Sequence, residues 1–137
     1  MQTKTEQLIR AYYAAFNQQD MTTFLDLLSD DVIHDINQGH REQGKVAFSN
    51  FMQRMNHHYQ EQITDIVVCC DSSGQRAAAE FVVQGTYLQT DEGLPVANGQ
   101  NYVLPAGAFF SIDTKQNKIT RVSNYYNLPD WIKQVSA

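Results

Sequence analysis

Cysteine is scarce in this chain, and the two that occur, Cys69 and Cys70, are direct neighbours. Adjacent side chains on a strand point to opposite faces, so these two thiols are poorly placed to bridge each other. Two cysteines without spaced partners also argue against a disulfide scaffold and against a zinc site. We expect both to be ordinary strand residues in a reducing compartment.

Basic runs and long apolar stretches are missing as well. The net charge is −5 and Lys and Arg do not cluster, which disfavours nucleic acid and anionic membrane surfaces as partners. No stretch approaches the roughly 20 apolar residues that span a bilayer. The polar segment Met1–Glu6 lacks the apolar core of a signal peptide. These absences predict a cytoplasmic protein that contacts neither membrane nor nucleic acid.

The composition is that of a globular protein. With 137 residues, 42% apolar and 18% charged, the chain suits a single domain (1–137) with a real core. Helical periodicity dominates the first part, over Thr5–Asn17, around 24–28 and over Lys45–Tyr59. The first helix carries one apolar stripe, formed by Leu8, Ile9, Tyr12, Tyr13 and Phe16.

Strand patterns dominate the remainder of the chain. A short strand is predicted at Val32–Ile36, followed by a turn region from Gly39 to Gly44. Longer strands are predicted at Ile63–Cys70, Arg76–Leu88, Asn101–Asp113 and Asn117–Asn127, and a last helical turn begins at Leu128. Helices first and antiparallel strands afterwards indicate an α+β domain.

The strand Arg76–Leu88 shows which of its faces belongs to the interior. Ala77, Ala79, Phe81, Val83 and Tyr87 share one face. Gly85 falls in the same line and suggests a bend or a bulge. Glu80, Gln84 and Thr86 lie on the opposite, outer face.

The sequence resembles the NTF2-like superfamily, and within it the ketosteroid-isomerase-like and SnoaL-like branch. The resemblance rests on Tyr12–Asp20, Leu27–Val32, the His34-Asp35 strand and Lys118–Val122. It implies a cone-shaped fold, in which a curved antiparallel sheet wraps around the N-terminal helices. It also implies a homodimer that contacts through the outer sheet face, and a pocket for a small apolar or polycyclic molecule. Neither a cofactor nor a metal is expected.

Carried over residue by residue, the resemblance assigns only part of a ketosteroid isomerase site. An aspartate base and two oxyanion donors, a tyrosine and a protonated aspartic acid, make up that site. The tyrosine falls on Tyr12. The base falls on Asp35 if this strand is one residue shorter than the family pattern, and on Ile36 in a gapless match. The second acid falls near Ala108, which has no carboxyl group, so ketosteroid isomerase activity itself is not expected.

Asp35 is the candidate base. Desolvation in an apolar cone would raise the pKa of its carboxyl, which suits a base working near neutral pH. The alternative is a carboxylate in a turn or ladder that faces solvent. His34 has the opposite strand parity, but related SnoaL-like cyclases use His and Asp together, so it stays a catalytic candidate. Tyr12 either donates into the cavity or packs in the core.

The remaining candidates are predicted to bind ligand. Asn37 and His40 could line the mouth, although turn chemistry also explains Asn37. Asn124, which shares an inward face with Val122 and Tyr126, could bind a ligand carbonyl or belong to a structural network. The predicted ligand-binding residues are Asn37, Phe51, Tyr87, Tyr102, Phe110, Asn124, Tyr126 and Trp131.

Two classes of function remain open from the sequence. In the first, the pocket is an enzyme site for proton transfer or cyclisation on a small apolar carbonyl compound. In the second, the domain binds a ligand, or acts as a dimeric module, without turnover. The missing acid at Ala108 favours the second class, whereas Tyr12 and Asp35 favour the first.

Overall fold

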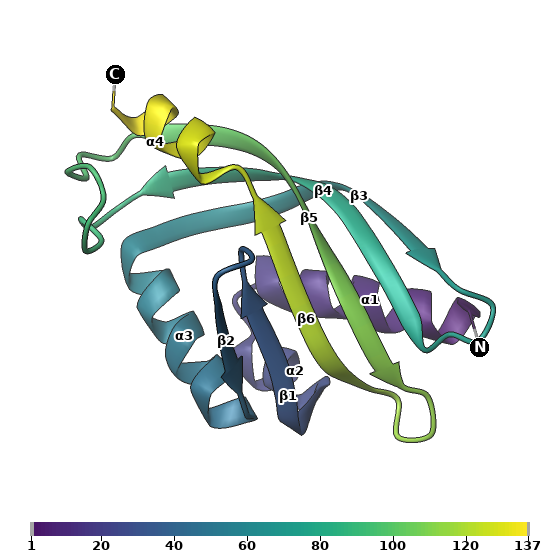
Figure 1. Ribbon diagram of the computed structural model, residues 1–137. Coiled ribbons are helices and arrows are strands. Elements are labelled where there is room, and N and C mark those ends of the chain that lie inside the picture. Colours follow the sequence, from purple (N-terminus) through teal and green to yellow (C-terminus); the bar gives the residue numbers. More distant parts are fainter. Residues whose placement is uncertain (1, 137) are drawn as a thin grey trace.

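Helices occupy the first part of the chain and long strands the second, as Figure 1 shows for the computed structural model, which describes residues 2–136. The helices are α1 (Gln2–Asn17), α2 (Met21–Asp26), α3 (Lys45–His58) and α4 (Leu128–Val135). The strands are β1 (Leu28–Ile36), β2 (His40–Gln43), β3 (Tyr59–Cys70), β4 (Arg76–Tyr87), β5 (Asn101–Asp113) and β6 (Lys118–Tyr126). The predicted α+β class is confirmed.

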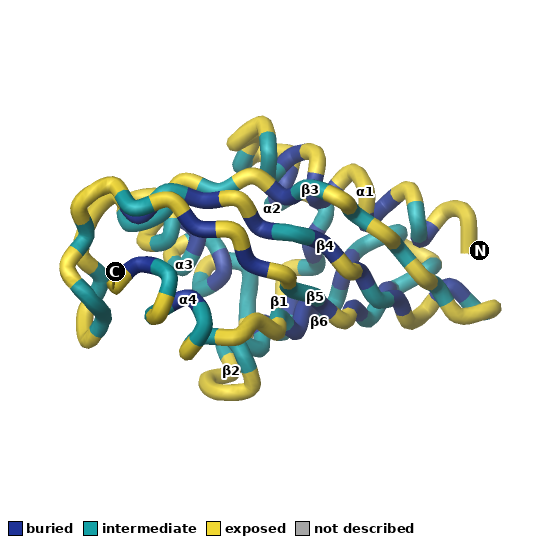
Figure 2. The backbone as a smooth tube through the Cα atoms, turned by 90° about the horizontal axis from the view of Figure 1, so that it is seen from above, coloured by how far each residue is buried: buried dark blue, intermediate teal, exposed yellow. Residues whose placement is uncertain are grey.

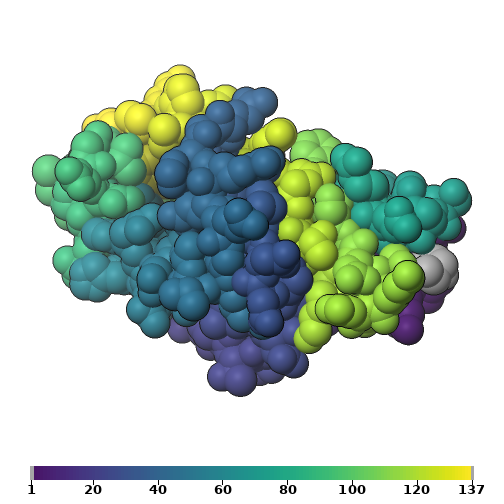
Figure 3. Space-filling view, turned by 60° about the horizontal axis from the view of Figure 1, so that its bottom comes forward, coloured from purple at the N-terminus to yellow at the C-terminus, as the bar shows by residue number. Residues whose placement is uncertain are grey.

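The strands form one curved, unclosed sheet in the order β2-β1-β6-β5-β4-β3. Adjacent strands are antiparallel except β1 and β6, which run parallel, so the expected all-antiparallel sheet is corrected at this pair. A parallel pair needs a long connection, and here most of the chain lies between the two strands. Figure 3 shows the segment from β1 to α3 covering one face of the molecule beside β5 and β6.

The core lies between α1 and the concave face of the sheet. The stripe residues Leu8, Ile9, Tyr12 and Tyr13 are buried, because α1 turns this face towards β3 and β4. Burial alternates along the strands, as Figure 2 shows. On β4 the buried residues are Ala77, Ala79, Phe81, Val83, Gly85 and Tyr87. The predicted interior face of β4 is therefore confirmed.

Of the bend or bulge suggested at Gly85, the bulge is contradicted by the strand pairing. Gly85 pairs with Glu61 on β3 and with Tyr102 on β5, and the register runs through it without a break. A bulge occurs instead in β3, between Thr64 and Val67, where the φ angle of Asp65 is 54°. An extra residue on one strand bends that strand, which adds to the concavity of the sheet.

The largest departures from the sequence-based expectation concern the three strands β1, β2 and β3. β1 begins at Leu28, because this residue already pairs with Ile119, so the end of the expected second helix is strand. His40–Gln43, expected to lie in a turn, forms edge strand β2 against β1. β3 begins at Tyr59, four residues before the predicted start at Ile63.

Asn17 fastens the end of α1 to β3. Its side-chain oxygen accepts from the backbone N–H of Ile63 at 2.8 Å, and its Nδ2 donates to the Ile63 carbonyl at 2.9 Å. Gln62 Nε2 donates to the Asn17 carbonyl at 3.0 Å. The Asn17 side chain thus satisfies both the N–H and the C=O group of Ile63, as a neighbouring strand would. These bonds fix the position of the end of α1 along β3.

Candidate active site

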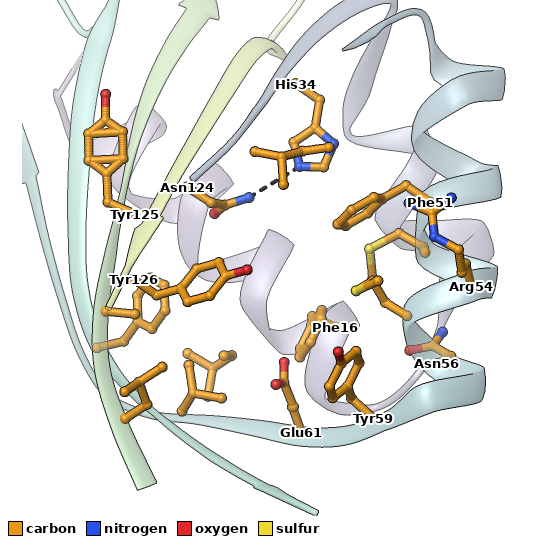
Figure 4. Close-up of a pocket in the computed structure, with 18 of the residues that line it drawn as sticks. Phe16, His34, Phe51, Arg54, Asn56, Tyr59, Glu61, Asn124, Tyr125 and Tyr126 are labelled. Carbon is orange, nitrogen blue, oxygen red and sulfur yellow. Dashed lines mark hydrogen bonds between the residues drawn. The ribbon is translucent and has the colours of Figure 1, made fainter. Parts of the chain in front are cut away.

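A cavity of about 510 Å³ lies between the concave face of the sheet and helices α1 and α3. Its volume is in the range of sites for small organic molecules. Aromatic and aliphatic side chains make up most of the wall, and Figure 4 shows the polar groups that point into it. Among the apolar wall residues are Phe16, Phe24, Phe48, Phe51, Met52, Phe81, Leu104 and Trp131.

A histidine–asparagine pair forms one polar group of the cavity. His34 Nε2 and Asn124 Nδ2 lie 3.2 Å apart, and both residues line the cavity (Figure 4). The His34 ring stacks on Phe48 at 4.1 Å between centroids and meets Phe51 edge-on at 4.6 Å. Its Nδ1 is buried and has no hydrogen-bond partner within residues 2–136. A buried polar atom without a partner is uncommon in folded proteins.

Burial keeps the His34 imidazole neutral. The residue is 1% exposed, and desolvation lowers its pKa to about 4, against a smaller opposing effect of the Asp35 carboxylate. At neutral pH the ring therefore offers one donor and one acceptor nitrogen rather than a positive charge. The sequence-based placement of His34 and Asn124 in the cavity agrees with this geometry.

Tyr12 also lines the cavity, but aromatic packing surrounds it. Its ring stacks on Phe24 at 4.5 Å and meets Phe110 edge-on at 5.8 Å. Desolvation by burial raises the pKa of Tyr12, so its hydroxyl stays protonated. The neighbouring Tyr13 hydroxyl is fully buried and lacks a partner within the described chain.

Asp35 does not share the cavity with Tyr12, which contradicts the convergence expected from the sequence. Strand alternation places it on the other face of β1, away from His34. Its Oδ1 lies 2.5 Å from Arg41 Nε, its Oδ2 lies 3.1 Å from Arg41 Nη2, and Ser123 Oγ donates to Oδ2 at 2.6 Å. Hydrogen bonds from Arg41 first, and then from Ser123, hold the pKa of Asp35 below its usual value. Asp35 is therefore a ladder residue outside the cavity, as the alternative reading of the sequence has it, but its carboxylate forms an ion pair with Arg41 that was not part of that reading.

The other predicted ligand-binding residues divide into two groups. Phe51, Tyr102, Asn124, Tyr126 and Trp131 line the cavity. Asn37, Tyr87 and Phe110 do not, so their assignment is corrected.

Each corrected residue has a structural task. The Asn37 side chain accepts from the Tyr126 backbone N–H at 2.9 Å in a turn where its own φ is 48°. Tyr87 is fully buried, and its hydroxyl donates to the Pro95 carbonyl at 2.7 Å. Phe110 is fully buried against Tyr12. Turn geometry and core packing therefore account for all three residues.

Glu61 is the carboxylate that the cavity does contain. It comes from β3, and Figure 4 shows its side chain directed into the cavity. Tyr102 Oη donates to Glu61 Oε2 at 2.5 Å. Oε1 makes no hydrogen bond within residues 2–136. Desolvation raises the pKa of Glu61, and the hydrogen bond from Tyr102 opposes this rise only in part. A carboxylate with a raised pKa in an apolar cavity is suited to proton transfer.

Two further tyrosines, Tyr59 and Tyr126, line the cavity that contains Glu61. Tyr126 points its hydroxyl towards the middle of the cavity in Figure 4. Tyr59 donates to Asp91 Oδ2 at 2.8 Å, which ties the loop between β4 and β5 to the cavity wall. Desolvation raises the pKa of Tyr126, and the Glu61 and Asp91 carboxylates raise it further. Both hydroxyls therefore stay protonated at neutral pH.

The sequence around Glu61 has the alternating pattern of a strand. Tyr59, Glu61 and Ile63 alternate with polar residues and so share one face of a strand. Because β3 was expected to start at Ile63, Glu61 was assigned to the connection before it. An acidic residue in line with the inward face of a strand is the pattern that identifies it.

The cavity has no evident metal centre. Within residues 2–136, no three His, Cys, Asp or Glu side chains gather as possible metal ligands. Its charged wall groups are the acids Glu42, Glu61 and Asp91, with Arg54 on α3 as a nearby cation. No helix in this part of the chain has the length and apolarity to cross a membrane.

Solved structures support the fold and identify close relatives. A proposed polyketide cyclase from Pseudomonas putida KT2440 is 63% identical, covering 93% of this chain and 95% of its own, with a TM-score of 0.90. Another from Xanthomonas campestris pv. campestris is 54% identical, covering 98% of both chains, with a TM-score of 0.93. A Mycobacterium tuberculosis LEH-like epoxide hydrolase, 18% identical over 98% of this chain and 86% of its own, shares the fold with a TM-score of 0.74.

Sequence comparison leads to the same group of proteins. No curated protein matches the chain significantly. The family model of the SnoaL-like domain matches residues 9–122. This match begins within α1 and ends within β6, so it includes His34 and Glu61 and stops before Asn124 and Tyr126. The chain belongs to the SnoaL-like domain family, within the NTF2-like fold.

Proposed function

We propose that this protein catalyses acid–base chemistry of the cyclase or isomerase type on a small, neutral and largely apolar carbonyl compound. The observation that carries the proposal is the Glu61 carboxylate, held by Tyr102 through one oxygen and free at the other, inside an apolar cavity. The relatives described as proposed polyketide cyclases support a polyketide-derived ketone as the substrate class.

In this proposal Glu61 is the base. Its free oxygen removes a proton from the carbon next to the substrate carbonyl, and the electron pair of that C–H bond moves towards the carbonyl oxygen. The resulting enolate is stabilised by hydrogen bonds from neutral donors, for which Tyr126 and Asn124 are the candidates. In a cyclisation the enolate carbon then attacks a second carbonyl group and closes a ring, and the alkoxide formed takes the proton from Glu61. In an isomerisation the enolate is conjugated with a C=C bond and takes the proton from Glu61 at a different carbon.

The charges of the cavity support a neutral ligand. Glu61 and Asp91 are acidic, His34 is uncharged at neutral pH, and the arginine of the wall, Arg54, is exposed, so a ligand carboxylate deep inside the cavity would meet no buried cation there. Burying an unpaired charge costs several kcal/mol. We therefore expect ketones and esters to bind better than the corresponding free acids.

Ligand binding without turnover is the second candidate function. It is favoured by the buried Ala108, where the second oxyanion acid would stand, and by the Tyr102 and Tyr59 hydroxyls, which already donate to carboxylates. In that case the same neutral ketones would bind and would leave unchanged.

Exchange of carbon-bound hydrogen in D2O separates the two functions without knowledge of the final product. A panel of neutral aromatic and polyketone compounds is incubated with the protein, and deuterium uptake next to the carbonyl is followed by mass spectrometry. We expect uptake with the natural chain and a loss of at least 100-fold with Glu61→Gln. Binding, measured by calorimetry, should remain.

Glu80→Gln is the matched control, because Glu80 is an exposed glutamate on the outer face of β4. It should exchange at the natural rate, as should Asp35→Asn. Unchanged exchange in Glu61→Gln would remove Glu61 from the mechanism. Binding of a ketone without exchange by the natural chain would favour the non-catalytic function.

A further inference from the structure

Three residues lie directly opposite one another across three adjacent strands. Glu61 on β3 is paired with Gly85 on β4, and Gly85 is paired with Tyr102 on β5. Neighbouring strands are about 4.8 Å apart, so Glu61 and Tyr102 are separated by two strand spacings, close to 10 Å along the sheet. The Tyr102 hydroxyl nevertheless reaches Glu61 Oε2 at 2.5 Å. The side chain of Tyr102 must therefore cross over the middle strand.

Gly85 leaves the space through which Tyr102 crosses. A Cβ atom at position 85 would lie 2.5 Å from both Cε2 and Oη of the Tyr102 ring, and it would overlap Cζ as well. Atoms do not approach this closely without a shift, and Tyr102 is only 3% exposed. Trp131 packs edge-on against Tyr102 at 5.8 Å between centroids, so the ring has little freedom to move away.

We propose that Gly85 is a positioning residue for the acid–base site: its missing side chain allows Tyr102 to reach across β4 and donate its hydrogen bond to the Glu61 carboxylate. Gly85 needs no special backbone conformation for this purpose, because it pairs in register as an ordinary strand residue. The proposal refines the function proposed above, since it concerns the carboxylate assigned there as the base. It explains why a glycine stands in the middle of a long strand, where this residue is otherwise unfavourable.

Among the titratable groups around Glu61, Tyr102 is the one that contacts the Glu61 carboxylate directly. Tyr102 is the only hydrogen-bond partner of the Glu61 side chain within residues 2–136. The remaining titratable and charged groups that line the cavity are Tyr12 and Tyr13 on α1, His34 on β1, His40 and Glu42 on β2, Arg54 on α3, Tyr59 on β3, Asp91 in the β4–β5 loop and Tyr126 on β6, whereas Tyr125, next to it, directs its ring to the outer face of the sheet (Figure 4). The Tyr102 hydroxyl stabilises the charged carboxylate, so its loss should move the pKa of Glu61 upward.

A titration of the Glu61 carboxyl by 13C NMR tests the proposal in the intact protein. Glu61→Gln identifies the resonance by its disappearance. Tyr102→Phe, which keeps the ring and removes the donor, should raise the midpoint by about one to two pH units, the range expected for a hydrogen bond to a charged group. Gly85→Ala should raise it similarly, because the displaced ring no longer reaches Oε2.

The double variant Gly85→Ala/Tyr102→Phe decides whether Gly85 acts through Tyr102. The proposal expects its midpoint to equal that of Tyr102→Phe alone, since the hydrogen bond is already absent. A Gly85→Ala protein that titrates like the natural chain would overturn the proposal, and so would additive shifts in the double variant. A purely structural role of Gly85 would lower stability without moving the midpoint.

Unfolding measurements keep the proposal testable if Gly85→Ala folds poorly. Removing the ring in Tyr102→Ala makes room for the new methyl group, so Gly85→Ala should destabilise the Tyr102→Ala protein less than it destabilises the natural chain. An equal loss in both backgrounds would overturn the steric link between the two residues. These readouts do not depend on turnover, so a failure of the proposed function, seen as absent hydrogen exchange, is distinguishable from a failure of this inference.

Discussion

The His34 side chain combines a neutral imidazole with nearly complete burial. Phe48 and Phe51 enclose the ring, and the Asn124 amide meets its Nε2. No hydrogen bond joins the imidazole to a carboxylate within the described chain, because Asp35 points to the other face of β1 and binds Arg41, and burial disfavours a charged imidazolium in this place. Protonation of His34 therefore opposes folding.

We predict that His34 makes the protein less stable in acid. Its pKa is about 4 in the folded chain and about 6.5 when unfolded, so between these values the unfolded chain binds more protons. The free energy of unfolding should therefore fall as the pH drops from 6.5 to 4, by about 3 kcal/mol from this residue. Urea unfolding of the natural chain and of His34→Gln across this range measures the effect.

The comparison with His34→Gln removes the influence of the other acids. Glu61, whose raised pKa acts in the opposite direction, and Asp35 are present in both proteins. The two stability curves should converge towards pH 4 if the natural chain is the more stable at pH 7. Parallel curves would contradict the prediction.

Single residues show where sequence reasoning works and where it fails at this scale. Strand parity predicted that His34 and Asp35 would face opposite ways, and this is confirmed. Parity alone does not say which of the two faces the cavity. The partner of Asp35 is Arg41 on β2, a strand that was expected to be a turn, so the ion pair could not be anticipated.

At the scale of elements, the junction of α1 with β3 depends on the Asn17 side chain. Its two hydrogen bonds to the Ile63 backbone are the only hydrogen bonds of the Asn17 side chain within the described chain. Ile63 follows Glu61 on the same face of β3. Asn17→Ala would leave both backbone groups without that partner in a partly buried place.

We predict that Asn17→Ala lowers the free energy of unfolding by about 2–3 kcal/mol, the sum expected for two such hydrogen bonds. Chemical denaturation followed by circular dichroism gives this value. Gln18→Ala is the control, because its side chain is exposed and the substitution should change stability by less than about 0.5 kcal/mol. A loss in Asn17→Ala no larger than that of the control would show that α1 docks without this contact.

Strand starts were the weakest part of the sequence-based prediction. The long strand β5 was predicted with its observed bounds, because turn residues mark both of its ends. β3 directly follows α3, with no Gly or Pro to mark the change, so the first four strand residues were assigned elsewhere. The base of the proposed mechanism lies in those four residues, which is why the cavity was predicted without it.

At the scale of the whole molecule, the outer face of the sheet exposes apolar side chains. Val103 is 57% exposed, Phe109 46% and Tyr125 37%, and the rings of Phe109 and Tyr125 lie 5.3 Å apart. Val103 is paired with Gln84, so this patch continues the face that the family resemblance assigns to a homodimer contact. We propose that a second copy of the chain covers it.

We predict that Phe109→Glu converts a dimer into a monomer, because the new carboxylate would be buried without a partner in the contact. Analytical ultracentrifugation should give twice the chain mass of 15.6 kDa for the natural protein and the single mass for the variant. Val96→Glu, at a 74% exposed position in the β4–β5 loop, is the control and should stay dimeric. A natural chain that sediments as a monomer would contradict the proposal.

The single tryptophan of the chain, Trp131, lies in the cavity wall at 4% exposure. Tyr87 and Tyr102 meet its indole ring edge-on, and Tyr102 also donates to Glu61 in the cavity. The tryptophan fluorescence of the protein therefore originates beside the ligand site alone. A ketone that binds in the cavity should quench or shift that emission. The affinity of the natural chain for unlabelled compounds can therefore be measured by fluorescence titration.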